Sequence, residues 1–381
     1  MDCRCTYSLR VTKCWISLTA QLVQATSQES FKRKPDMFLK TKNPISIMSK
    51  GITLCGQQIA QVIGQKIRSD VAYLKSNFNI SPKLVVIEVG NLPQSKLYIT
   101  QKSKFAEKYG ILLSHMRFPS HIPESVLLDY VYKLNSDSSV HGITLQLPFD
   151  SDSNINVTNS LNAVATLKDV EGLNAYNTAV LSRGDILCPH CENVKQQHVH
   201  IPCTAAACYA FIRHVNFPII GSRCVIIGGG RLVGAPTADL LSRSCGATVI
   251  QCHIQSNNIN EEIKRGDVVI SAVGHPRLIK GEWIRPGALV IDCGYSVLND
   301  PQNPNKSRCV GDVEFETAIE NAKWITPVPG GVGPVSIAML FRNTVNSAKW
   351  SVGLNNSICS CPNYCENDIL SKELVDRKVS T

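Results

Sequence analysis

Residues 224–234 read CVIIGGGRLVG, and this stretch decides the fold of the second half of the chain. Its first four residues are apolar and predict a buried strand, and three glycines follow at once. The residues after Gly234 favour a helix as far as Arg243. A strand, a glycine-rich turn and a helix in this order are typical of a dinucleotide-binding unit, because the glycines let a pyrophosphate approach the start of the helix.

Further apolar stretches extend this unit into a sheet. One follows about twenty residues later, as a Rossmann unit requires, and three more come after it. They lie at 248–253, 267–272, 288–292 and 323–325. Together with the first stretch, these four predict a parallel sheet of five strands in a Rossmann-type domain.

The first half of the chain also alternates between helix and strand. Helical spacing of apolar residues covers 57–75, and a second helix is expected over 95–109, before Gly110. The short apolar stretches 84–90 and 142–148 read as buried parallel strands. The fold class is therefore α/β, with an N-terminal α/β catalytic domain before the Rossmann domain.

Composition excludes several classes of protein. The apolar share of 44% and the charged share of 18% are those of a globular chain. No apolar run reaches the length of a membrane span, and no basic stripe interleaved with aromatics indicates nucleic-acid binding. The net charge of +9 owes much to the first fifty residues, where nine Lys and Arg outnumber three Asp and Glu.

The sixteen cysteines are too scattered in a chain of this size for a disulfide scaffold, so a reducing compartment is expected. Cys224 and Cys293 lie in apolar runs and are expected to pack as small core residues. One segment, 188–200, collects Cys188, His190, Cys191, His198 and His200. Its ligand types suit zinc, but the spacing is short for a zinc site, and a polar surface loop is the favoured interpretation.

Residues 1–47 are basic and rich in Ser and Thr, which fits a mitochondrial transit peptide as well as a disordered cytosolic extension. The location is therefore expected to be cytoplasmic or the mitochondrial matrix. The tail 353–381 is expected to be disordered.

The segment 89–102 reads VGNLPQSKLYITQK. Tyr98 and Lys102 stand four residues apart on the expected helix, so their side chains share one face. An amphipathic surface helix would show the same pair. A tyrosine beside a lysine at the mouth of a sheet can also stack on a flat ring and transfer a proton.

The segment 326–334 reads TPVPGGVGP, with three prolines and three glycines. Proline restricts the backbone and glycine lets another group approach it closely, so a ligand-contacting loop is favoured over a plain turn.

These segments resemble the motifs of the bifunctional methylenetetrahydrofolate dehydrogenase/methenyltetrahydrofolate cyclohydrolase family. Three shorter motifs of that family follow in the same order along the chain, as QLP at 146–148, KDVEG at 168–172 and PCT at 202–204. The resemblance runs from about residue 51 to 350. It implies oxidation of 5,10-methylenetetrahydrofolate with NADP or NAD, and hydrolysis of the methenyl product to 10-formyltetrahydrofolate.

The resemblance also implies roles for individual residues. Lys102 would be the acid/base group, Gln146 its hydrogen-bond partner, and Tyr98 would stack on the folate. Other expected substrate contacts are Leu147, Pro148, Asp169, Glu171, Pro329, Gly330 and Gly331. Expected cofactor contacts are Gly228, Gly229, Gly230, Arg231, Val233, Gly234, His253, Ile254, Gly274 and Gly294.

The chain departs from the family at three of these positions. The family usually carries Asp where Glu171 stands, Arg where Gly229 stands and Ser where Ile254 stands. The last two normally contact the 2′-phosphate of NADP. No acidic residue ends the second strand either, so the usual sign of NAD is missing too. Arg231 is the cation that could compensate.

The expected domains are 48–195 for folate catalysis, 196–327 for NAD(P) binding, and 328–352 as a loop and helix that pack back on the first domain. The partners implied are tetrahydrofolate derivatives, a nicotinamide dinucleotide and a second copy in a homodimer, and no metal is expected. Two alternatives stay open, a monofunctional dehydrogenase and a nucleotide-binding protein that has lost turnover.

Overall fold

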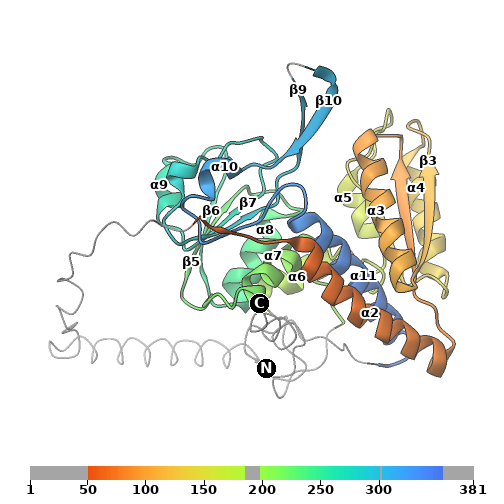
Figure 1. Cartoon of the computed structure of the whole chain (residues 1–381). Coiled ribbons are helices and arrows are strands. Elements are labelled where there is room, and N and C mark those ends of the chain that lie inside the picture. The colour runs from red at the N-terminus through yellow and green to blue at the C-terminus, as the bar shows by residue number, and fades with distance from the viewer. Residues whose placement is uncertain (1–49, 185–197, 301–302, 355–381) are drawn as a thin grey trace, which may run out of the picture. The chain divides into compact units, whose positions relative to one another are not determined.

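The computed structural model describes residues 50–184, 198–300 and 303–354. The basic N-terminal extension, most of the Cys/His-rich segment and the C-terminal tail lie outside these residues. Within them, two parallel sheets and a hairpin are joined by helices (Figure 1). None of the helices in these described ranges combines the length and the apolar content needed to cross a membrane.

The smaller sheet has three parallel strands in the order β3-β2-β4. They are β2 (Lys83–Val89), β3 (Leu112–Phe118) and β4 (Gly142–Gln146), joined by α3 (Pro93–Tyr109) and α4 (Glu124–Ser136). Both strands expected from the sequence are present. The edge strand β3 was missed because it is half-exposed and its sequence, LLSHMRF, mixes polar with apolar residues. As expected, α3 ends at Gly110, whose φ of 80° is left-handed.

The larger sheet has six parallel strands in the order β1-β11-β8-β7-β5-β6. The five expected strands are all there, as β5 (Arg223–Ile227), β6 (Thr248–Cys252), β7 (Val268–Ser271), β8 (Leu289–Asp292) and β11 (Trp324–Ile325). The sixth, β1 (Ile52–Thr53), comes from the start of the folded region and pairs with β11. Two residues are too few to give a periodic signal in the sequence.

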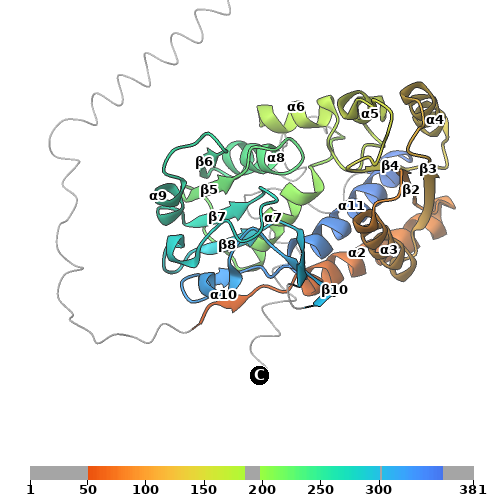
Figure 2. The same ribbon diagram turned by 90° about the horizontal axis from the view of Figure 1, so that it is seen from above.

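Helices cover both faces of the larger sheet (Figure 2). They are α7 (Cys203–His214), α8 (Gly234–Asp239), α9 (Ile259–Lys264) and α10 (Phe315–Ala318), with a short 3₁₀ turn, η2 (Gly281–Trp283). The helix expected up to Arg243 changes its winding, because α8 runs directly into a π-helical turn, η1 (Leu240–Ser244).

Two long helices stand between the sheets, and they lie side by side in both views (Figures 1 and 2). They are α2 (Gly56–Phe78) and α11 (Val332–Trp350), and one apolar core includes residues of both helices and of both sheets. A buried ion pair adds to this packing, because Lys349 Nζ on α11 lies 2.8 Å from Asp70 Oδ2 on α2. Asn343 on α11 donates to the carbonyls of Val170 and Ile201.

Three further elements complete the described chain. Two short helices, α5 (Val157–Ala163) and α6 (Ala175–Arg183), follow β4, and each is capped by the side chain of an asparagine, Asn156 and Asn174. An antiparallel hairpin, β9 (Ser296–Asp300) and β10 (Asn303–Val310), follows β8 and projects from the larger sheet (Figure 1).

Candidate active site

Lys102 lies in a polar cluster at the carboxyl end of the smaller sheet. It is buried on α3, with 7% of its surface exposed. Its Nζ donates to Gln146 Oε1 at 3.1 Å and lies 3.8 Å from Glu171 Oε1. The same Glu171 oxygen accepts from Thr144 Oγ1 at 2.7 Å. The lysine is thus held by one amide oxygen and one carboxylate, which fixes the position of its amine.

The strand geometry explains this cluster. Thr144 and Gln146 stand two residues apart on β4, so their side chains project from the same face. Sequence reasoning found Gln146 and missed Thr144, although the two-residue period of the strand could have found it. Leu147 and Pro148 follow β4 directly, and the peptide bond between them is cis.

Asp169 is buried, and its hydrogen bonds lead to the start of α6 and not to Lys102. It is 3% exposed, and its Oδ2 accepts from the backbone N–H of Asn174 and from Asn177 Nδ2, both at 2.8 Å. Burial raises the pKa of Asp169 to about 6. The contacts that the structure gives this carboxylate hold the start of α6.

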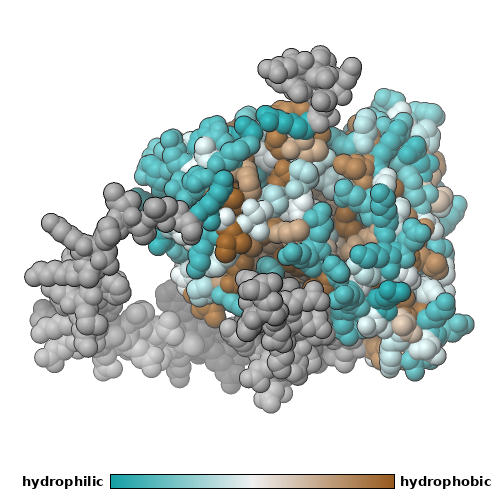
Figure 3. Space-filling model, in the orientation of Figure 1, coloured by the Kyte–Doolittle hydropathy of each residue, from teal (hydrophilic) through white to brown (hydrophobic). Residues whose placement is uncertain are grey.

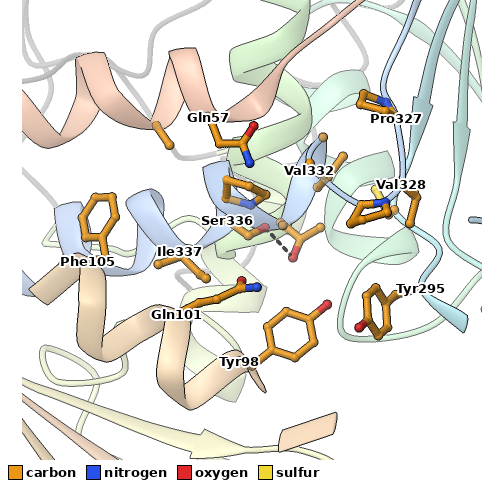
Figure 4. A pocket seen from close by; sticks show the side chains of 18 of the residues that line it. Gln57, Tyr98, Gln101, Phe105, Tyr295, Pro327, Val328, Val332, Ser336 and Ile337 are labelled. Carbon is orange, nitrogen blue, oxygen red and sulfur yellow. Dashed lines mark hydrogen bonds between the residues drawn. The ribbon is translucent and has the colours of Figure 1, made fainter. Parts of the chain in front are cut away.

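A cavity of about 700 Å³ lies between α2, α3 and α11 on one side and the larger sheet on the other (Figure 4). Tyr98 and Gln101 enter it from α3, and Gln57 enters it from α2. Val233, from the glycine-rich turn, and Gly294, after β8, line the opposite wall. In Figure 3 apolar surface gathers in the middle of the molecular face, between hydrophilic flanks.

Two tyrosines meet across this cavity. The ring centroids of Tyr98 and Tyr295 are 5.6 Å apart, in an edge-on arrangement (Figure 4). Burial raises the pKa of the Tyr98 phenol. A hydrogen bond with the Cys309 thiol, 3.1 Å away on β10, is the main cause that raises the pKa of Tyr295 to about 12. Both phenols are therefore protonated at neutral pH and can donate hydrogen bonds.

The loop 327–333, which the sequence predicts to contact a ligand, forms one wall of the cavity. Pro329, Gly330 and Gly331 all line it, and the Val328–Pro329 bond is cis. Gly330 has a φ of 103°, which favours glycine. A side chain on Gly331 would meet the carbonyl of Pro327 at 2.5 Å, whereas one on Gly333 would enter open space.

The glycine-rich turn after β5 has the form that a pyrophosphate cradle needs. Gly228 has a φ of 110°, and a Cβ there would meet the carbonyl of Ala272 at 2.3 Å. A Cβ on Gly234 would lie 1.9 Å from the carbonyl of Gly228, so the turn and the start of α8 touch through bare backbone. Gly229 and Gly230 have no neighbour nearer than 3.9 Å to their Cβ positions, and both residues are exposed.

The end of β6 lies beside this turn. A Cβ on Gly229 would be 4.0 Å from His253 Cβ, and Ile254 is 98% exposed. Arg231 lies elsewhere, in a separate cavity of about 320 Å³, together with residues of α5, α6 and α8.

The cysteines and histidines that the sequence analysis singled out lie in different environments. Cys224 is fully buried, as expected. Cys293 lies past the end of β8, where it packs against the core, with its Sγ 3.4 Å from Cys208 Sγ, and also lines the large cavity. His200 is a core residue whose Nε2 lies 2.9 Å from Ser347 Oγ, and burial lowers its pKa to about 3. Among the described residues, no group of three or more His, Cys, Asp or Glu side chains could hold a metal ion. Cys188, His190 and Cys191 lie outside these residues.

The order of the larger sheet, with its glycine-rich first turn, places the chain among the two-domain α/β proteins that bind a dinucleotide. Comparison with known families defines it further. A profile described as "Tetrahydrofolate dehydrogenase/cyclohydrolase, catalytic domain" matches residues 54–171, and one described as the NAD(P)-binding domain of the same proteins matches residues 202–352. The chain belongs to the tetrahydrofolate dehydrogenase/cyclohydrolase family.

Individual relatives agree. The chain is 40% identical over 333 residues to the cytoplasmic C-1-tetrahydrofolate synthase of Homo sapiens, a match covering 84% of this chain and 34% of the relative. The chain thus spans about a third of that protein's length. It is 40% identical to bifunctional protein FolD 2 of Pseudomonas syringae, over 76% of this chain and 90% of the relative.

Solved structures show the same fold. The methylenetetrahydrofolate dehydrogenase-cyclohydrolase of Trypanosoma brucei, solved with NADP and an inhibitor, is 33% identical in sequence. It superposes with a TM-score of 0.74, over 80% of this chain and all of that one.

Proposed function

We propose that this chain oxidises 5,10-methylenetetrahydrofolate with NADP or NAD and hydrolyses the methenyl product to 10-formyltetrahydrofolate. One observation carries the proposal. Lys102, fixed by Gln146 and Glu171, stands one helical turn from Tyr98, and Tyr98 lines the same cavity as Val233 and Gly294 of the dinucleotide-binding half. A flat ring held at Tyr98 would therefore lie close to both the lysine and the cofactor.

In the first reaction the cofactor supplies the acceptor of a hydride. The substrate carbon between N5 and N10 loses one hydrogen with two electrons and becomes part of a methenyl cation. The glycine-rich wall at 330–331 lets a flat ring approach the backbone, because these residues carry no Cβ. We assign Tyr98 to stacking on the folate ring and the turn 228–234 to holding the pyrophosphate.

In the second reaction water adds its oxygen to the methenyl carbon and loses one proton, which passes through Lys102 to solvent. The second proton then moves from the new hydroxyl group to N5 as the bond between carbon and N5 breaks. We assign both proton transfers to Lys102, which Gln146 and Glu171 hold in place. Glu171 keeps the carboxylate expected at this position, and its bond to Thr144 fixes the longer side chain.

The decisive experiment measures the two reactions separately on the purified chain. Reduction of NADP and of NAD is followed with 5,10-methylenetetrahydrofolate, and loss of methenyl absorbance is followed without any cofactor. The proposal expects both reactions. Reduction without hydrolysis would show a monofunctional dehydrogenase, and cofactor binding without either reaction would show a nucleotide-binding relative.

We also propose a homodimer located in the cytoplasm or the mitochondrial matrix. The family resemblance supports the dimer, and the human relative is named as cytoplasmic. Light scattering of the purified chain tests the dimer, and a monomer at micromolar concentration would contradict it. Import of a fusion of residues 1–47 to a reporter separates the two compartments.

A further inference from the structure

Two buried aspartates at the carboxyl edge of the larger sheet have no part in the roles assigned so far. Asp292 ends β8 and is 3% exposed, and Asp312 follows β10 and is fully buried. Asp292 also lines the large cavity. Neither carboxyl group forms an ion pair within the part of the chain that the structure describes, although buried carboxylates are costly without a partner.

The pair ties three loops together. Asp312 Oδ2 accepts from Ser271 Oγ at 2.8 Å and from the backbone N–H groups of Val273 and Gly274, at 2.8 and 3.2 Å. Asp292 accepts from the backbone N–H groups of Gly294, Asp312 and Val313, at 2.8 to 3.1 Å. The ends of β7, β8 and β10 are thereby fixed to one another, at the edge where open α/β sheets bind their ligands.

One oxygen of this pair is left over. Asp312 Oδ1 is buried and has no hydrogen-bond partner among the described residues. A Cβ built on Gly294 would lie only 2.2 Å from this oxygen, so it stands directly behind the Gly294 backbone. Gly294 forms the cavity wall next to Tyr295, whose ring faces Tyr98 (Figure 4). An uncompensated acidic group therefore stands behind the wall that the ring of a bound nicotinamide would face.

The surroundings act differently on the two carboxyl groups. Burial, together with the neighbouring Asp312, raises the pKa of Asp292 to about 7. By contrast, Asp312 Oδ2 accepts three hydrogen bonds, one from a hydroxyl group and two from backbone N–H groups, an arrangement that stabilises the charged form of a carboxyl group. No Lys, Arg or His nitrogen lies within 4.0 Å of either carboxyl group in the described ranges to cancel this charge.

We propose that the Asp292–Asp312 pair favours binding of the oxidised cofactor over the reduced cofactor. The oxidised nicotinamide ring carries a positive charge and the reduced ring is neutral, so a fixed negative charge behind the wall stabilises only the oxidised form. The pair acts through the electrostatic field and through the three loops, and its members are positioning residues. The inference rests on the dinucleotide site of the proposed function and extends it to the redox state of the ligand.

The test removes the charge and keeps the hydrogen bonds. In Asp312→Asn, the amide oxygen can accept from Ser271, Val273 and Gly274 as the carboxylate does. Calorimetric dissociation constants are measured for NADP⁺ and NADPH, and for NAD⁺ and NADH. We expect the affinity for the oxidised cofactor, divided by the affinity for the reduced cofactor, to fall about tenfold in the variant. A loss of this size is expected when a unit charge a few ångströms from a partly solvated, charged ring is removed.

The matched control is Asp267→Asn. Asp267 precedes β7, at the opposite edge of the same sheet, where it accepts from the backbone N–H of Arg223 and forms an ion pair with Arg285. This substitution removes the same charge far from the cavity, and we expect it to leave the ratio unchanged.

Each remaining outcome overturns the inference. An unchanged ratio in folded Asp312→Asn, or an equal loss of affinity for both forms, would show a purely structural pair. If that variant does not fold, the affinities of the wild-type protein for the oxidised and the reduced cofactor serve as the test. Tenfold tighter binding of the reduced cofactor would contradict a charge that stabilises the oxidised ring. Failure of the wild-type protein to bind any nicotinamide would overturn the proposed function as well, which the other outcomes leave intact.

Discussion

Replacing Lys102 with methionine should stop hydrolysis of methenyltetrahydrofolate and leave cofactor binding nearly intact. Methionine keeps an unbranched, apolar side chain in a site where the lysine is 7% exposed, but it cannot carry a proton. Loss of a general acid/base group typically costs 10²–10⁴-fold in rate, or about 2.7–5.4 kcal/mol of transition-state stabilisation. The cofactor turn at 228–234 has no contact with Lys102 among those the structure gives, so cofactor affinity should change little.

The substitution also has a cost in stability. Gln146 Oε1 loses its donor and Glu171 loses its cation, keeping the hydrogen bond from Thr144. An unsatisfied buried partner costs about 1–3 kcal/mol, so the variant should unfold at a lower denaturant concentration.

The assay follows methenyl absorbance at a fixed protein concentration and at a temperature below the onset of unfolding. The matched control is Lys96→Met, which removes the same charge from an exposed position on the same helix. We expect the control to hydrolyse at the wild-type rate. A Lys102→Met variant that is folded and hydrolyses methenyltetrahydrofolate within threefold of the wild-type rate would refute the assignment of proton transfer to this lysine.

Three further predictions concern the cavity, the cofactor and a buried acid. In Gly333→Val the new side chain enters open space on the cavity wall. The Michaelis constants should therefore rise severalfold, with little change in melting temperature. A large loss of stability with unchanged Michaelis constants would contradict this prediction. Gly229 and the exposed Ile254 stand where the family usually contacts the 2′-phosphate, and a charge-assisted hydrogen bond there would be worth ~1.5–3 kcal/mol. Without it, the preference for NADP over NAD in kcat/KM should be about tenfold or less. A hundredfold preference would show that another cation holds the phosphate, and Arg231→Ala would then be the next variant to measure. Asp169 has its pKa raised to about 6, so its folded form binds a proton more tightly than the unfolded chain does, and its contribution to stability falls as pH rises from about 4 to 6. Urea unfolding should therefore show that the stability of the wild-type protein, relative to Asp169→Asn, is higher at pH 5 than at pH 7.5 by roughly 1.4 kcal/mol, and parallel pH profiles would show that this carboxyl group does not titrate as stated.

The sequence predicts the main elements of both sheets because their strands are short, apolar and closed by glycine or proline. The turn 228–234 and the pair Tyr98/Lys102 stand on the predicted elements, since a four-residue helical spacing and a strand-turn-helix order are local properties. Within the two parallel sheets, the strands absent from the prediction, β1 and β3, are too short or too polar to give a periodic signal. The hairpin strands β9 and β10 were not predicted either.

The contacts of individual side chains could not be predicted, because they depend on how distant segments pack. Because the family resemblance makes Gly331 an expected substrate contact, Gly331→Val would be the natural probe of binding from sequence alone. The structure shows that its Cβ would lie 2.5 Å from the carbonyl of Pro327, so that substitution would displace the loop, and Gly333 is the better probe. Neither Asp169 nor Arg231 is among the residues that line the large cavity, because Asp169 accepts from the start of α6 and Arg231 lines the smaller cavity.

A single-turnover reaction tests the central claim most directly, with the chain in excess over 5,10-methylenetetrahydrofolate, NADP and NAD in separate runs, and the folate products separated by chromatography. The account predicts one reduced nicotinamide for each folate consumed, and 10-formyltetrahydrofolate as the final product of the wild-type protein. Methenyltetrahydrofolate should accumulate instead in Lys102→Met. Bound folate and bound cofactor with no reduced nicotinamide, or equal yields of the formyl product at equal rates in both proteins, would contradict the account.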